Sequence, residues 1–404
     1  ALPIFSGEPG SEVVVRVRRG EEELDIPIIR GQIRTRTVKG YYREGEHWRF
    51  LLNDDSGIAY LRITQFTETT EPQLVDALQE LSGEAKAYVL DLRSNPGGIL
   101  QAAWRIADMF LPGDLPIVAS EGRTHPREEY ISTDARTLVP PEVPVVVLVN
   151  DESASASEIL AGALRDHDRA VIVGTRTFGK GTVQTVVPLE SNAGQLKITE
   201  AYYYLPSGRQ VHRTDRSVKW GVDPTPGFYV STTRDERRGI NRWSYDADII
   251  AQVGEEPFQP RAEPEQIRAD MNDPQLAAAV EALGIRLATG AWEPTGGEMD
   301  EEAIDAQALV DLANGRERLL RELERVDRRM SVLLDTGLSL EETENERDLF
   351  PDEVELTGGE VVITDADGVE IARLTITGES LERWLLDADV VKVEPAAPAA
   401  DEDP

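Results

Sequence analysis

Three serines alternate with small residues in the segment 150–158, which reads Asn-Asp-Glu-Ser-Ala-Ser-Ala-Ser-Glu. The segment follows an apolar run that predicts a buried strand and precedes a run with helical spacing. A serine at the start of a helix is well placed to be a nucleophile, because unpaired backbone N–H groups and the helix dipole stabilise an oxyanion there. The structural alternative is a capping box, in which Ser155 and Glu158 satisfy the first backbone N–H groups of the helix.

A serine nucleophile needs a base, and none of the histidines stands in a motif that would supply one. The four histidines are His47, His125, His167 and His212. Lysine is the alternative, and Lys180 stands between two glycines in the segment Thr-Phe-Gly-Lys-Gly-Thr-Val-Gln. Burial disfavours the charged form of an amine, and a neutral lysine can accept the proton of a serine hydroxyl. Alternation along a strand would place Gln184 on the same face as Lys180, where its amide could hold the amine. An exposed lysine at the end of a strand is the plain alternative.

A third segment, Asp-Leu-Arg-Ser-Asn-Pro-Gly-Gly at 91–98, follows an apolar strand. Paired glycines let backbone amides approach a ligand closely, which suits one arm of an oxyanion hole. A strand-to-helix turn built on Pro-Gly is the alternative.

The elements around these segments alternate between strand and helix. Apolar runs predict strands at 58–64, 87–92, 143–149 and 170–173, and helical spacing predicts helices at 71–82, 99–110 and 157–166. This rhythm predicts an α/β fold with a mainly parallel sheet and flanking helices. Ligands of such sheets bind at the carboxyl ends of the strands, where two of the three segments lie.

The flanking regions differ from this core. A hairpin is expected from two β-like runs at 11–19 and 22–30. After a linker at 257–264, helices are expected at 273–287 and 300–334, and a second hairpin at 360–377.

The charge of the chain is concentrated near its end. The 404 residues include 42 basic and 75 acidic ones, a net charge of −33. Residues 251–404 hold 39 acids and 13 bases, a net charge of −26, whereas residues 1–250 carry −7. A shift of this size indicates a domain boundary. The acidity excludes a typical nucleic-acid binder, and the lack of cysteine excludes disulfides, thiolate metal sites and cysteine nucleophiles. No apolar run is long enough to span a membrane.

Taken together, five segments resemble the C-terminal processing (tail-specific) serine peptidases, and they occur in that family's order over roughly residues 1–230. They read YLRITQF, VLDLRSNPGG, VLVNDESASASEILAGAL, IVGTRTFGKGTVQ and ITEAYYYLPSGRQVHR. The resemblance implies a core similar to crotonase and Clp protease. One residue departs from the pattern, because Glu152 stands where the family has glycine.

The resemblance also implies the roles of the site residues. The family's nucleophile precedes its lysine by 25 positions, which selects Ser155 as nucleophile and Lys180 as general base. Gln184 would orient the lysine. The oxyanion donors would be the N–H of Ala156 and that of either Gly97 or Gly98. The resemblance implies no metal or cofactor.

Four regions follow from the resemblance and the composition. Residues 1–33 are expected to be the C-terminal remnant of a PDZ domain, 34–240 the peptidase core, 241–392 an acidic accessory α+β region and 393–404 a disordered acidic tail. A periplasmic or cell-envelope location is expected, with a signal peptide removed upstream of Ala1.

The expected function is that of a serine endopeptidase that cleaves proteins near their C-termini. Its partners would be proteins or peptides with unstructured C-termini, not nucleic acid. The acidic C-terminal region would serve homo-oligomer or adaptor contacts. Two alternatives remain, a catalytically silent peptide-binding scaffold of the same fold and a crotonase-like acyl-CoA enzyme.

Overall fold

The computed structural model describes residues 7–20, 22–31, 35–53, 55–188, 195–214, 217, 219–249, 261–299, 301–335, 360–364 and 370–375. The chain divides into two compact units, Ala1–Leu312 and Ala313–Pro404. The first unit contains all three segments that the sequence singles out.

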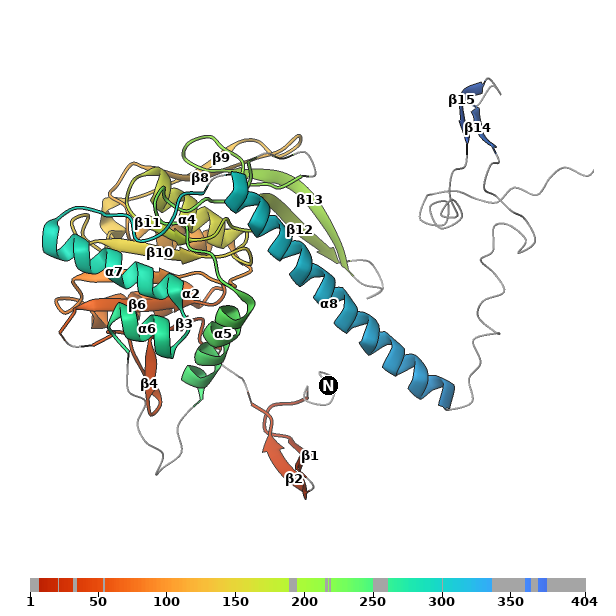
Figure 1. The fold of residues 1–404 in the computed structure, drawn as a ribbon, viewed down its shortest axis with the longest axis horizontal. Helices are drawn as coiled ribbons and strands as arrows, with labels where there is room; N and C mark the ends of the chain where they lie inside the picture. The colour runs from red at the N-terminus through yellow and green to blue at the C-terminus, as the bar shows by residue number, and fades with distance from the viewer. Residues whose placement is uncertain are drawn as a thin grey trace, which may run out of the picture. The chain divides into compact units, whose positions relative to one another are not determined.

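A five-stranded sheet forms the centre of the first unit (Figure 1). Its strands, in spatial order, are β11 (Val171–Gly174), β10 (Val145–Val149), β7 (Ala87–Asp91), β6 (Ile58–Ile63) and β3 (Val38–Lys39). The first four are mutually parallel, and only β3 runs antiparallel to its neighbour. Strands β7, β10 and β11 are buried along their whole length, as parallel strands covered on both faces are. The mainly parallel α/β core is therefore confirmed.

Helices cover both faces of this sheet. One face packs against α2 (Thr70–Glu80), α3 (Leu100–Asp108) and α4 (Ala156–Asp166). The other face packs against α5 (Arg234–Asp248), α6 (Pro264–Asp270) and α7 (Pro274–Thr289). On this second face, Leu276, Val280 and Leu283 of α7 share one apolar cluster with Val146 and Leu148 of β10. The residues after 240 thus complete the core of the sheet, and the unit extends to Leu312 rather than ending at the change in charge.

The remaining strands form smaller sheets. A four-stranded antiparallel sheet has the order β12 (Thr182–Pro188), β13 (Gln195–Tyr204), β8 (Pro116–Glu121) and β9 (Glu128–Ile131), and a 3₁₀ turn at Asp134–Arg136 follows it. A short hairpin joins β4 (Tyr42–Glu44) to β5 (His47–Arg49). The two expected hairpins are also present, as β1 (Glu12–Arg19) with β2 (Glu22–Ile29) and β14 (Glu360–Thr364) with β15 (Glu370–Thr375).

The expected C-terminal helix at 300–334 is present as α8 (Glu301–Asp335). Within the described residues, no helix is both long and apolar enough to cross a bilayer. Half of the expected linker (residues 257–260) and the whole acidic tail lie outside the described residues. That β1 and β2 belong to a PDZ domain stays a prediction.

Candidate active site

The three segments singled out in the sequence meet at the end of the central sheet that the carboxyl ends of its parallel strands form. They follow β7, β10 and β11, which are adjacent and parallel, so their carboxyl ends point the same way. The backbone N–H of Ala154 donates to Asn95 O at 3.0 Å, and that of Phe178 donates to Ser153 O at 3.0 Å. The serine segment (residues 150–158) therefore lies between the glycine loop (residues 91–98) and the lysine loop (residues 177–184) and is hydrogen-bonded to both.

The hydroxyls of the three alternating serines have different surroundings. Ser153 Oγ donates to Leu92 O at 2.8 Å, and Ser157 Oγ donates to Asn95 O at 3.0 Å. Both of these serines thus hold the glycine loop in place. Ser155 and Glu158 have the capping-box arrangement, but the Ser155 hydroxyl makes no capping hydrogen bond to α4. Within the described residues, the Ser155 hydroxyl is the one of the three that makes no such hydrogen bond.

The backbone of Ser155 is in an unfavourable conformation, with φ 57° and ψ −113°. Positive φ is uncommon for residues other than glycine, and such outliers gather at functional sites. The residue is the N-cap of α4, so its side chain lies beside the backbone N–H groups of the first helical turn.

Glu158 connects the serine segment to the lysine loop. Its Oε2 accepts the backbone N–H of Ser155 and that of Lys180, both at 2.8 Å. Its Oε1 accepts the Gly179 N–H at 2.7 Å and the Thr177 hydroxyl at 2.6 Å. One carboxylate oxygen therefore holds the backbones of Ser155 and Lys180 next to each other. The sequence indicated only the capping role, because no local pattern links Glu158 to residues 19 to 22 positions away.

The carboxyl group of Glu158 is fully buried, and this burial raises its pKa above the ordinary value of a glutamate. The four donors act in the opposite direction, because hydrogen bonds to a carboxylate favour its ionised form. A protonated carboxyl would bring its own O–H against one of these donors. The arrangement is complete only with Glu158 ionised.

The lysine loop is closely packed next to Lys180, which is itself half-buried. A Cβ on Gly179, whose φ is 93°, would lie 2.7 Å from both Trp220 Cδ1 and Arg213 Cβ. Only glycine can therefore occupy position 179. Within the described residues, no hydrogen bond joins the side chains of Ser155 and Lys180, so it is their backbones that the structure holds together.

Gln184 lies further along, on β12, which begins only at Thr182. Its side chain is exposed and donates to Thr199 Oγ1 at 3.5 Å. The pairing of β12 with β13 shifts register between Val183 and Gln184. Among the residues that the structure describes, no hydrogen bond connects Gln184 to Lys180, and the orienting role stays a prediction.

The two glycines of the β7 loop differ in their backbone amides. The N–H of Gly97 donates to Asn95 Oδ1 at 2.9 Å, whereas the N–H of Gly98 has no hydrogen-bond partner in the described part of the chain. A Cβ on Gly97 would lie 2.8 Å from Ser155 Cβ and 2.9 Å from Ala156 N. The glycine loop therefore passes directly against the serine, and Gly98 rather than Gly97 has a free amide.

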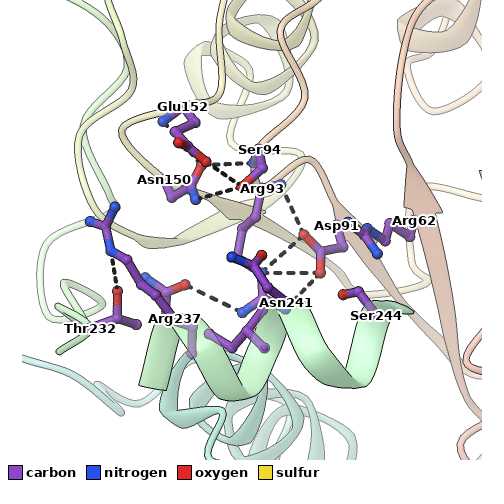
Figure 2. A pocket seen from close by; sticks show the side chains of 12 residues that line it. Arg62, Asp91, Arg93, Ser94, Asn150, Glu152, Thr232, Arg237, Asn241 and Ser244 are labelled. Atoms are coloured by element: carbon purple, nitrogen blue, oxygen red, sulfur yellow. Dashed lines mark hydrogen bonds and ion pairs between the residues drawn. The ribbon is translucent and has the colours of Figure 1, made fainter. Parts of the chain in front are cut away.

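A small polar pocket opens beside these loops (Figure 2). Ser94 Oγ donates to Glu152 Oε2 at 2.7 Å, and Asn150 Oδ1 accepts the Ser94 N–H at 2.8 Å. The glutamate that replaces the family's glycine thus binds the neighbouring loop from an exposed position.

Two of the histidines make hydrogen bonds away from Ser155. His167 Nε2 lies 2.6 Å from Pro116 O, and His125 Nε2 lies 3.3 Å from Ser120 Oγ. In the described part of the chain, no histidine is hydrogen-bonded to Ser155, and no group of three His, Asp or Glu side chains could hold a metal ion.

These features bring Ser155 and the lysine loop together, and the chain is similar to several known proteins. Residues 57–226 match the model of peptidase family S41. The chain is 37% identical over 308 residues to the carboxy-terminal-processing protease of Bartonella bacilliformis, an alignment covering 73% of this chain and 65% of the relative. It is 42% identical over 165 residues to the carboxyl-terminal-processing protease of Synechocystis sp., covering 40% and 38%.

A solved structure titled photosystem II D1 C-terminal processing protease is 30% identical, with a TM-score of 0.40, over 56% of this chain and 57% of that one. The chain spans less than two thirds of the length of each of these proteins.

Proposed function

We propose that this chain is a serine endopeptidase that cleaves protein substrates near their C-termini. The observation that carries the proposal is the carboxylate of Glu158, which accepts hydrogen bonds from the backbones of both Ser155 and Lys180 at 2.8 Å. The neighbouring serine hydroxyls are both hydrogen-bonded to the glycine loop, so Ser155 is the nucleophile. The names of the two bacterial relatives agree with this activity.

In the mechanism, neutral Lys180 takes the proton of Ser155 Oγ, and the oxygen attacks the scissile carbonyl carbon. The oxyanion that forms accepts hydrogen bonds from the backbone N–H groups of Ala156 and Gly98. Lys180 then protonates the leaving amine, and water hydrolyses the acyl-enzyme. Gln184 would hold the lysine amine once its side chain leaves Thr199.

The substrates would be proteins with unstructured C-terminal tails. A periplasmic or cell-envelope location and a PDZ origin of β1 and β2 belong to the same proposal. So does a crotonase- and Clp-protease-like core. The acidic C-terminal region would bind a second copy of the chain or an adaptor protein.

A cleavage assay tests the function directly. The purified chain is incubated with a small folded protein that carries an unstructured apolar tail, and mass spectrometry follows the substrate. The expected result is a shortened C-terminus with an intact N-terminus. Tail binding without cleavage would favour the scaffold alternative, and hydrolysis of an acyl-CoA thioester without peptide cleavage would favour the crotonase alternative.

The pH dependence of activity should reveal the ionisation of the Glu158 carboxyl group. Its raised pKa means that the folded protein binds this proton more tightly than the unfolded chain does. The resulting contribution to stability is complete below the unfolded pKa and is lost as the pH rises through the folded pKa. Activity depends on the ionised form and moves in the opposite direction. We therefore expect a further fall in activity on acidification, at a pH above the ordinary glutamate range and in addition to the loss caused by protonation of the general base, while circular dichroism shows a folded protein.

The matching variant is Glu158→Gln, whose amide N–H groups would face backbone donors. We expect kcat to fall about 100-fold, since small displacements of catalytic groups have effects of this size. The residual activity should lose the acid limb assigned to Glu158. Glu80→Gln, at the end of α2, is the control and should behave like the parent. An unchanged acid limb in Glu158→Gln would contradict the assignment.

A further inference from the structure

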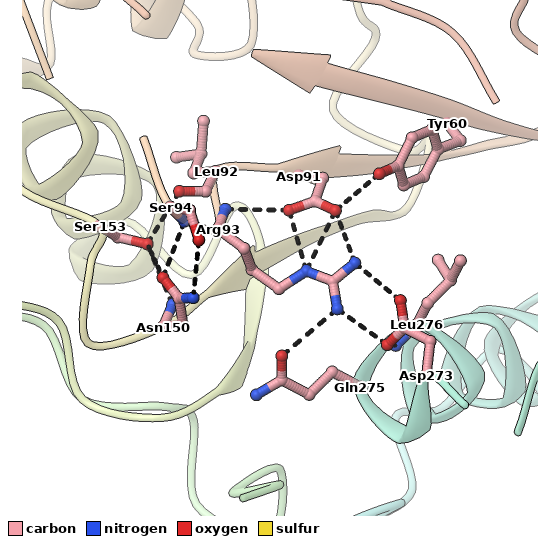
Figure 3. Close-up of polar contacts among 10 residues, drawn as sticks. All are labelled: Tyr60, Asp91, Leu92, Arg93, Ser94, Asn150, Ser153, Asp273, Gln275 and Leu276. Carbon is pink, nitrogen blue, oxygen red and sulfur yellow. Dashed lines mark hydrogen bonds and ion pairs between the residues drawn. The ribbon is translucent and has the colours of Figure 1, made fainter. Parts of the chain in front are cut away.

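Arg93 lies at the base of the glycine loop and is almost completely buried (Figure 3). Its Nη2 donates to Asp91 Oδ2 at 2.7 Å, and its Nε donates to Asp91 Oδ1 at 3.0 Å. Tyr60 donates its hydroxyl to the same carboxylate at 2.6 Å. These contacts come from β6 and β7, within the segment that matches the peptidase family.

The other side of the same guanidinium is held from far along the chain. Its Nη1 donates to Asp273 Oδ1 at 2.8 Å, and its Nη2 donates to Asp273 Oδ2 at 2.9 Å. Gln275 Oε1 accepts a longer bond from Nη1 at 3.3 Å. Asp273 is 1% exposed and lies outside residues 57–226. A two-point carboxylate–guanidinium pair fixes both direction and distance, because two parallel hydrogen bonds define one geometry.

Asp273 is also fixed relative to its own helix. Its Oδ1 accepts the backbone N–H of Leu276, so the residue is the N-cap of α7. Helix α7 in turn packs its apolar side chains against β7, β10 and β11. The carboxylate thus has a rigid support that faces the loop.

The loop that Arg93 begins carries the parts that the reaction needs. Asn95, two residues on, accepts the Ala154 N–H and the Ser157 hydroxyl at its backbone oxygen, and its side chain accepts the Gly97 N–H. Gly98 follows with the free amide. A shift at Arg93 would therefore reach both the serine segment and the oxyanion donor.

We propose that Asp273 is a positioning residue of the active site, which acts through Arg93 to hold the glycine loop in its catalytic geometry. This proposal rests on the proposed peptidase function for its kinetic consequence, but the underlying coupling between α7 and the loop does not depend on it. Helix α7 then helps to position the active site, although it lies outside residues 57–226, which match the family model.

The test uses Asp273→Asn in the full chain. Asparagine is an equally good N-cap, so α7 keeps its first turn, but the side chain loses its charge and one of its two acceptors for Arg93. The control is Asp270→Asn on the neighbouring α6, where the carboxylate is half exposed and pairs with Arg261. Backbone hydrogen exchange is measured by mass spectrometry without substrate, and peptide cleavage is measured separately well below each unfolding midpoint.

We expect exchange of residues 92–99 to be about tenfold faster in Asp273→Asn, while exchange of residues 276–289 stays at the parent rate. We expect kcat to fall about tenfold with KM within about twofold, because the loop acts on the reaction and not on substrate affinity. Asp270→Asn should match the parent in both measurements.

The outcomes separate the two proposals. Unchanged exchange of residues 92–99 overturns the coupling, whether or not the chain cleaves peptides. Faster exchange throughout 276–289 also overturns it, since Asp273 would then only attach the helix. A parent chain without peptidase activity contradicts the proposed function, while the exchange result still decides the coupling. If Asp273→Asn does not fold, Gln275→Leu removes the weaker acceptor of Arg93, together with the 2.8 Å hydrogen bond from Gln275 Nε2 to Val230 O. Exchange of residues 92–99 should then rise about threefold, and unchanged exchange of these residues would overturn the proposal.

Discussion

Replacing Ser155 by alanine is expected to lower the rate of peptide cleavage by about 10⁴-fold or more, because the reaction loses its nucleophile. The fold should be retained. The Ser155 hydroxyl makes no capping hydrogen bond, and Glu158 binds the backbone at this position rather than the side chain. Cleavage is measured by mass spectrometry of the substrate, and folding by circular dichroism and thermal unfolding.

The neighbouring serine makes this experiment specific. Ser157→Ala removes a buried hydrogen bond to Asn95 O and should lower stability by about 1 kcal/mol, with a much smaller loss of activity. Ser82→Ala, beyond the end of α2, should match the parent. A Ser155→Ala chain that keeps a tenth of the parent rate would place the nucleophile elsewhere.

Replacing Lys180 by methionine is expected to lower kcat by about 10³-fold, the usual contribution of a general acid–base group. Methionine keeps the length and volume of the side chain but cannot accept a proton. The backbone N–H of residue 180 should still donate to Glu158, so the loop stays in place. The measurement is kcat for a peptide substrate over a range of pH.

The control for this variant is Lys86→Met, an exposed lysine before β7, at the opposite end of the sheet. It should cleave like the parent. If Lys180→Met were as active as Lys86→Met, the base would be another group, and the histidines would have to be reconsidered.

The core of the fold is readable from the sequence because its strands are buried on both faces. Residues 145–149 are five consecutive aliphatic residues, which leaves little doubt about a buried strand. The role of α7 was missed for a related reason. The acidic surroundings of residues 251–404 suggested a separate region, but the helix itself contains only Glu281 and Arg286 as charged residues. The net charge of residues 251–404 is an average over 154 residues, and this average does not show that α7 is apolar and packs in the core.

The site could be predicted in part. The types and spacing of Ser155 and Lys180 identify them through the family resemblance, since each residue alone has an ordinary structural explanation. The choice between Gly97 and Gly98 needs coordinates, because it depends on which amide Asn95 Oδ1 engages. The links from Glu158 to the lysine loop and from Asp273 to Arg93 also need them, because they join residues separated by 19 to 22 and by 180 positions.

The unusual backbone at Ser155 makes stability and activity compete at this one residue. A φ of 57° with ψ −113° costs a serine on the order of 1–3 kcal/mol that a glycine would largely avoid. Evolution towards greater thermal stability alone would therefore favour losing the nucleophile.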